Sequence, residues 1–126
     1  MGVEVAIEEQ DRIVLVRLHG TVTFADFQDA RVTVTTSPGW SPSFAHVLDF
    51  TGITQLALSH HDVERLARAE PIFAPDAPQI LVARAGSVTF GLARMFQSYS
   101  EGRRLVQVVD SMERALAVLA ARALHR

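Results

Sequence analysis

The sequence contains no cysteine and no lysine, and only 7% of its residues are aromatic. Without cysteine the chain can form neither a disulfide framework nor a thiolate metal site. The longest uninterrupted apolar run, Ala115 to Ala121, is far shorter than the ~20 residues that a membrane-spanning helix needs. The sequence therefore predicts a globular domain that depends on an ordinary hydrophobic core.

Charge is sparse and nearly balanced, with 12 basic residues, all of them arginine, against 14 acidic ones. The arginines are scattered, and the only basic doublet is Arg103-Arg104, which we interpret as a solvated loop. Nucleic-acid binding normally requires a basic face, so we expect no nucleic-acid partner. The acidic N-terminus has no apolar stretch typical of a signal peptide, and we expect a cytoplasmic protein.

The hydrophobic pattern of the first half predicts an antiparallel hairpin followed by a helix and a strand. Val3 to Ile7 alternates apolar and polar residues, and Ile13 to Leu18 would be its partner strand. Thr23 and Asp26 form a capping-box pattern that opens a helix. The β-branched run 32–36 should end that helix early, and residues 37–42 form a loop. A strand follows over 45–50, which Thr51-Gly52 should break.

The second half predicts two strands and three helices. Ser59 and Asp62 open a helix that runs to about Glu70, and residues 79–85 read as a strand covered on both faces. The next helix follows Gly86-Ser87, ends at Gly102, and carries an apolar face at the spacing i, i+3, i+4, i+7, formed by Leu92, Met95, Phe96 and Tyr99. A strand over 105–109 and a helix over 112–124 complete the chain, the helix burying Met112, Ala115, Leu116 and Leu119.

The resulting order of elements is β-β-α-β-α-β-α-β-α. Strands that alternate with helices pair in parallel. We therefore expect an α/β fold with a mostly parallel central sheet, an antiparallel N-terminal edge strand and about four helices. Because an edge strand offers unpaired backbone groups, we expect that a homodimer could form through it.

Three segments resemble one bacterial family. Residues 47–54 (Val-Leu-Asp-Phe-Thr-Gly-Ile-Thr) are similar to the strand and turn of STAS-type domains, the fold of the anti-sigma-factor antagonist SpoIIAA. Residues 89–96 (Thr-Phe-Gly-Leu-Ala-Arg-Met-Phe) and 110–116 resemble the SpoIIAA-like proteins of mostly unknown function. The resemblance spans roughly residues 11 to 120. It implies a single SpoIIAA-like domain over residues 1–126, and a fold similar to CRAL-TRIO-type lipid-binding domains.

One departure from the antagonists concerns their phosphorylation switch. Antagonists that act as phosphoswitches carry an Asp-Ser pair at the start of the second helix, and here Ala57-Leu58 falls at that place. Neither residue can accept a phosphoryl group. Ser59, one residue further on, is either a displaced phosphorylation site or a helix N-cap, and the N-cap interpretation is favoured.

Several other residues have both a structural and a functional interpretation. Asp49 either binds a ligand or accepts N–H groups of the Thr51-Gly52 turn. Arg94 either binds an anion or pairs with Asp49 or Asp110. Ligands of parallel sheets bind beyond the carboxyl ends of strands, and helix N-termini favour anions. The candidate binding residues are Asp49, Thr51, Ser59, Ser87 and Asp110 at or near those ends, together with Arg94 in the following helix.

Metal and catalytic sites are not indicated. Adjacent helical residues point about 100° apart, so His60-His61 is interpreted as a solvated first turn rather than a pair of metal ligands. Motifs such as a nucleophile elbow, a P-loop or Gly-x-Gly-x-x-Gly do not occur. We therefore expect no catalytic residue, no cofactor and no enzymatic activity.

Two functions remain open. In the first, which the resemblance implies, the protein is a regulatory domain that binds another protein through residues 51–59. In the second, it binds a small anion or a lipid, with an acyl chain between the sheet and the helix of Leu92, Phe96 and Tyr99. A cavity in that layer would favour the second function. Trp40 is either a lid over the core or an exposed partner contact.

Overall fold

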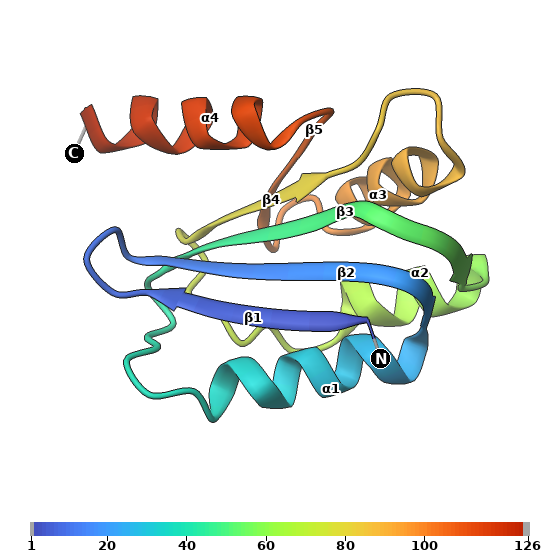
Figure 1. The fold of residues 1–126 in the computed structure, drawn as a ribbon, viewed down its shortest axis with the longest axis horizontal. Helices are drawn as coiled ribbons and strands as arrows, with labels where there is room; N and C mark the ends of the chain where they lie inside the picture. Colours follow the sequence, from blue (N-terminus) through green and yellow to red (C-terminus); the bar gives the residue numbers. More distant parts are fainter. Residues whose placement is uncertain (1, 125–126) are drawn as a thin grey trace.

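The computed structural model describes residues 2–124, which form five strands and four helices (Figure 1). Their order is the predicted one: β1 (Val3–Glu8), β2 (Ile13–Thr23), α1 (Phe24–Thr35), β3 (Ala45–Ala57), α2 (His60–Arg68), β4 (Pro78–Val82), α3 (Val88–Tyr99), β5 (Leu105–Val109) and α4 (Met112–Leu124).

The strands form one sheet in the spatial order β1-β2-β3-β4-β5. Strand β1 lies at one edge and pairs with β2 in antiparallel orientation, whereas the other three pairings are parallel. The predicted α/β class, with a mostly parallel sheet and an antiparallel N-terminal edge strand, is therefore confirmed.

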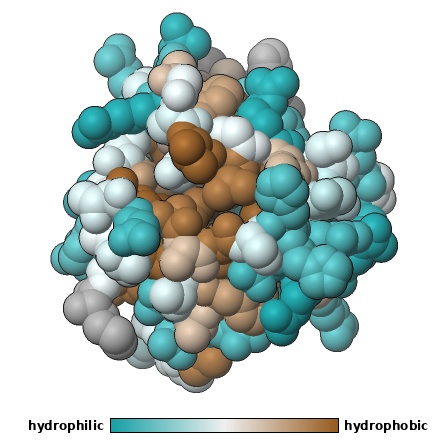
Figure 2. Space-filling model, turned by 90° about the vertical axis from the view of Figure 1, so that its right-hand side faces the viewer, coloured by the Kyte–Doolittle hydropathy of each residue, from teal (hydrophilic) through white to brown (hydrophobic). Residues whose placement is uncertain are grey.

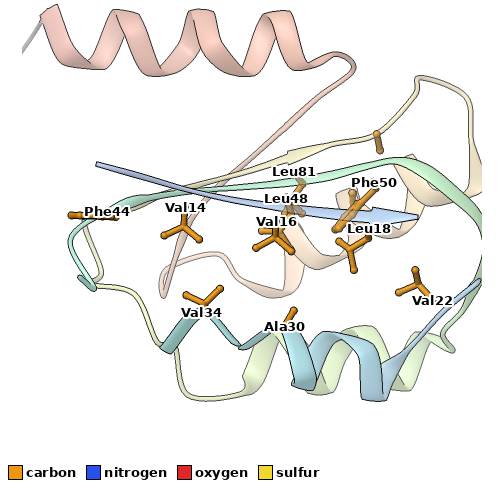
Figure 3. Close-up of a cluster of buried hydrophobic side chains, with 12 residues drawn as sticks. Val14, Val16, Leu18, Val22, Ala30, Val34, Phe44, Leu48, Phe50 and Leu81 are labelled. Carbon is orange, nitrogen blue, oxygen red and sulfur yellow. The ribbon is translucent and has the colours of Figure 1, made fainter. Parts of the chain in front are cut away.

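The helices cover the two faces of the sheet unequally. Helices α1, α2 and α3 lie on one face, and α4 lies alone on the other (Figure 1). Because side chains alternate along a strand, each inner strand contributes to both layers. In β4, Leu81 joins the cluster beneath α1 and α3, whereas Ile80 and Val82 join the cluster beneath α4. Figure 3 shows Val14, Val16 and Leu18 of β2 pointing toward Ala30 and Val34 of α1.

Strand β3 is longer than predicted, because Thr51-Gly52 does not break it. The strand continues to Ala57 alongside an equally extended β2, with register shifts between the two strands at Arg17/His19 and Gly20/Thr21. Gly52 permits this close pairing. A Cβ atom at that position would lie 3.0 Å from the His19 Cβ and 3.1 Å from the Leu18 carbonyl oxygen.

Helix α1 also continues where the sequence predicted an early end. Thr23 caps it through the predicted capping box with Asp26. At the other end, two of the β-branched residues donate side-chain hydrogen bonds to helix carbonyls four residues back. The Thr33 hydroxyl donates to the Asp29 carbonyl, and the Thr36 hydroxyl donates to the Val32 carbonyl. Val34 is fully buried. Packing and these hydrogen bonds outweigh the low helix propensity.

Two helix faces differ from the prediction. In α4, the predicted Met112, Ala115 and Leu119 pack on the sheet, but Leu116 is 53% exposed and Val118 takes its place. In α3, Tyr99 is exposed, and the helix ends there rather than at Gly102, with Ser100 as its C-cap. The amphipathic spacing identified both helices, but in each it included one residue, Tyr99 or Leu116, that the structure leaves exposed.

Candidate functional site

A cavity of about 140 Å³ lies between the sheet and helices α1, α2 and α3. Its walls are mainly apolar side chains from all three helices and from strands β2, β3 and β4, including Val16, Phe27, Leu48, Phe50, Leu66, Leu81, Leu92 and Phe96. Figure 2 views the side of the molecule where β2 and β3 end, and it shows hydrophobic side chains gathered at the centre and framed by hydrophilic ones.

Small side chains on the helices explain why this layer is incompletely filled. Ala30 of α1, Ala93 of α3 and Ala69, immediately after α2, all line the cavity. Alanine ends at Cβ, so each of these positions leaves space that a leucine would occupy. The structure thus contains a cavity beneath the helix of Leu92 and Phe96, the feature that we expected to favour binding of a small molecule over binding of a protein. Tyr99 is not part of its wall.

Two arginines connect α1 to the α2 segment above this cavity. The Arg65 guanidinium of α2 lies 4.1 Å from the ring centroid of Phe24, the first residue of α1. Further along α1, Arg31 donates a hydrogen bond to the Glu70 carbonyl oxygen. Arg31 follows Phe24 by seven positions in the helix, which corresponds to a rise of about 10 Å along the helix axis. The cavity wall contributed by Phe27 and Ala30 lies between these two contacts.

His46 is a buried polar residue in the cavity wall. It is only 8% exposed, and neither of its ring nitrogens has a hydrogen-bond partner. Its ring stacks on Phe73, with the centroids 4.3 Å apart. Burial, and secondarily the positive charge of Arg104, lower the pKa of His46 to about 3. The imidazole is therefore neutral at pH 7, with one nitrogen a donor and the other an acceptor.

Arg104 also lines the cavity and holds the end of α2. Its Nη2 atom donates to the carbonyl oxygens of Leu66, at 3.2 Å, and Ala69, at 2.6 Å. Its Nε atom is buried without a hydrogen-bond partner. Burial, followed by the charges of Arg103 and Arg31, lowers the pKa of Arg104, but a guanidinium remains charged in proteins.

The interpretation of Arg103-Arg104 as a solvated loop is confirmed for Arg103, which is exposed in a turn, and wrong for Arg104, which is half-buried. Arg103 donates to the Ala67 carbonyl, so both side chains satisfy carbonyls at the C-terminal end of α2. Those carbonyls have no partner within the helix, and the negative end of the helix dipole favours a cation there.

The residues proposed from sequence do not converge on this cavity, since none of the six lines it. The Asp49 carboxylate accepts the Thr51 backbone N–H at 3.0 Å and its hydroxyl at 2.7 Å, which is the structural alternative considered for Asp49. Ser59 and Ser87 are N-caps of α2 and α3. Asp110 pairs with Arg114 and not with Arg94. Arg94 is exposed and takes part in none of the ion pairs within residues 2–124.

The other candidates are placed as follows. His60 and His61 are exposed at the start of α2, and within residues 2–124 no group of three or more His, Cys, Asp or Glu side chains could hold a metal ion. Trp40 packs over the core as a lid. Among the helices described, none is long and apolar enough to cross a membrane.

Sequence reasoning missed His46 and Arg104, although each left a signal. His46 interrupts the otherwise apolar run of β3 from Ala45 to Leu48. Arg104 belongs to the only basic doublet in the chain. Neither signal predicts that the side chain is buried. Arg104 is covered by the end of α2 and His46 by Phe73, and both are distant in the sequence.

One of the solved structures that resemble this fold matches nearly the whole chain. It is the crystal structure of an uncharacterised DUF3478-family protein from Shewanella loihica PV-4, described as having a SpoIIAA-like fold. The match has a TM-score of 0.61 and covers 94% of both chains, at 18% sequence identity. This chain has a SpoIIAA-like fold. At this identity the likeness shows the SpoIIAA-like architecture alone. No protein-family model matches the chain, and the comparison with curated proteins gives no match.

Proposed function

We propose that the protein is a non-catalytic binding domain that takes up a small, largely apolar molecule in the cavity beneath α1, α2 and α3. The observation that carries this proposal is the cavity itself. Protein interiors are close-packed, and voids larger than a water molecule are few. An engineered apolar cavity of about 150 Å³ binds benzene, and this one has about 140 Å³.

The energetics of the cavity support the same conclusion. An enclosed void costs about 24 cal/mol per Å³ of stability; because this cavity is partly open to solvent, its 140 Å³ costs less than the roughly 3 kcal/mol that a closed void of that size would cost. That upper bound is a substantial part of the roughly 5–15 kcal/mol that stabilises an ordinary domain. A ligand that fills the space recovers part of this free energy through burial of its apolar surface, about 25 cal/mol per Å².

Native mass spectrometry of the untagged protein, purified from its own host, tests the proposal. We expect an added mass that is lost on denaturation. A second test is calorimetric titration with 1-octanol, an uncharged probe with a single apolar chain. The matched variant is Ala93→Leu, whose larger side chain occupies the cavity and should abolish octanol binding. The proposal is wrong if the wild-type protein carries no added mass and binds neither octanol nor the charged eight-carbon analogues octanoate and octyl phosphate.

Binding of a regulatory protein through residues 51–59 remains a second candidate, and it rests on the resemblance to the antagonists. Thr54 and Gln55 are exposed at the end of β3 and offer an accessible surface there. Asp62 and Glu64 are poor test positions, because Asp62 caps α2 and Glu64 pairs with Arg68. Replacing Thr54 and Gln55 with arginine would abolish such an interaction without disturbing the helix.

A further inference from the structure

We infer that the ligand is an amphiphile whose anionic head group lies against Arg104 and His46, while its apolar tail occupies the rest of the cavity. This inference rests on the proposed function and specifies the chemical class of the ligand. It follows from three features: the polarity of the cavity, the arginines near one end of it, and the unpartnered nitrogen atoms in its wall.

The cavity wall is polar at one end and apolar at the other. His46 and Gln79 are register partners at the amino ends of β3 and β4, and both line the cavity. Arg104 lies immediately before β5 and lines the same end. Toward the carboxyl ends of the strands the wall is mainly apolar, with Leu56 and Leu58 at the end of β3. A ligand that matches this wall has a polar group at one end only.

Positive charge gathers at the polar end without acidic partners. Arg31, Arg103 and Arg104 all donate to carbonyl oxygens between Leu66 and Glu70. Within residues 2–124, none of the three forms an ion pair with a carboxylate. Two of them, Arg31 and Arg104, line the cavity. An anion at this place would neutralise charge that the backbone carbonyls only partly compensate.

Three nitrogen atoms in the same region are buried and unpartnered, namely Nε of Arg104 and both ring nitrogens of His46. Buried polar atoms are almost always hydrogen-bonded, and the exceptions require an explanation. The Arg104 Nε–H and the one N–H of a neutral imidazole are donors. The oxygens of a carboxylate or a phosphate would accept from both, and hydrogen bonds to an ionised acceptor are the stronger kind.

The test compares three eight-carbon ligands at pH 7 by calorimetric titration: octanoate, 1-octanol and monooctyl phosphate. We expect octanoate or octyl phosphate to bind at least about tenfold more tightly than octanol, as a charge-assisted hydrogen bond would give. The tighter of the two anions identifies the head group as a carboxylate or a phosphate. If octanol binds as tightly as both anions, the inference fails and the proposed function stands. If none of the three binds and the purified protein carries no added mass, the proposed function itself fails.

Variants locate the head group. Arg104→Gln should weaken binding of the preferred anion by about tenfold or more and leave octanol binding unchanged. Arg103→Gln is the matched control, because Arg103 belongs to the same arginine cluster but does not line the cavity; its affinity should stay within about threefold of wild type. If Arg104→Gln does not fold, Arg31→Gln replaces it as the test. Wild-type anion affinity in Arg104→Gln, or in Arg31→Gln where Arg104→Gln does not fold, would overturn the inference.

Discussion

The imidazole of His46 stacks on the ring of Phe73, with the ring centroids 4.3 Å apart and the planes inclined by 25°. His46 belongs to β3, and Phe73 belongs to the segment between α2 and β4. The stacking therefore fastens a long connection to the sheet at the polar end of the cavity. It also buries an ionisable group that has no counter-ion, which makes the fold sensitive to pH.

His46 should contribute a specific loss of stability in acid. The folded protein keeps it neutral down to about pH 3, below the ordinary value of 6.5. Between those values the unfolded chain binds the proton and the folded protein does not. The free energy of unfolding therefore falls as the pH drops through this range, by about 1.4 kcal/mol per pH unit. Between pH 7 and pH 5, wild type should lose about 2 kcal/mol more than His46→Phe in urea denaturation.

The control for this experiment is His60→Gln, which removes an exposed histidine at the start of α2. Its stability should fall with pH as steeply as that of wild type. Equal slopes for wild type and His46→Phe would show that burial of His46 does not oppose protonation.

Leucine substitutions should have unequal effects on stability on the two faces of the sheet. Ala93 and Ala115 are both buried alanines on helices, but Ala93 of α3 lines the cavity, whereas Ala115 of α4 packs directly on the sheet. Ala93→Leu should change the free energy of unfolding by less than about 1 kcal/mol, because space exists for the added atoms. Ala115→Leu overpacks its layer and should cost about 1–3 kcal/mol. Similar losses in chemical denaturation for both variants would contradict a cavity beneath α3.

Two glycines should respond oppositely to alanine. A Cβ at Gly52 meets the backbone of β2 at 3.1 Å, whereas a Cβ at Gly91 meets nothing within 4 Å. Gly52→Ala should therefore destabilise the protein by about 1–3 kcal/mol through overpacking. Gly91→Ala, at the fourth residue of α3, should stabilise it by up to about 1 kcal/mol. Thermal unfolding of wild type and both variants shows whether each substitution raises or lowers stability. A Gly52→Ala variant as stable as wild type would disprove the tight β2–β3 pairing.

Ser59 should act on stability through its capping bond. Its hydroxyl accepts the Asp62 backbone N–H at 3.1 Å, and the Asp62 side chain accepts the Ser59 N–H at 3.0 Å. Ser59→Ala should cost about 1 kcal/mol. Ser59→Asp should stay within about 0.5 kcal/mol of wild type, since aspartate is an equally good N-cap. If both variants unfold at the wild-type urea concentration, the cap is not needed for α2.

The order of helices and strands could be predicted from the sequence, because each element is marked by residues close together in the chain. Capping pairs at Thr23/Asp26 and Ser59/Asp62 marked two helix starts, and alternation marked the hairpin, so the order of elements followed. The errors arose where tertiary contacts override local preference. Strand β3 runs through Gly52 because β2 extends beside it, and Thr33 and Thr36 stabilise the end of α1 by bonding back to its carbonyls.

The candidate site was harder to predict from the sequence, because the cavity exists only where small side chains leave space between the helices and the sheet. Three alanines leave the cavity open, yet alanine in a helix carries no sequence signal of emptiness. Arg104 lies 35 residues beyond Ala69, whose carbonyl it binds, and no local pattern relates the two. The sequence predicted a ligand at the carboxyl ends of the strands, whereas the unpartnered polar atoms of His46 and Arg104 lie near the amino ends.

Trp40 is the only tryptophan in the chain, and its indole meets the edge of Phe73 at a centroid distance of 6.1 Å. Phe73 in turn forms part of the cavity wall. One aromatic ring thus separates the dominant fluorophore from the space where a ligand would lie. The protein carries its own optical reporter, and its intrinsic emission can follow the filling of the cavity without any added dye.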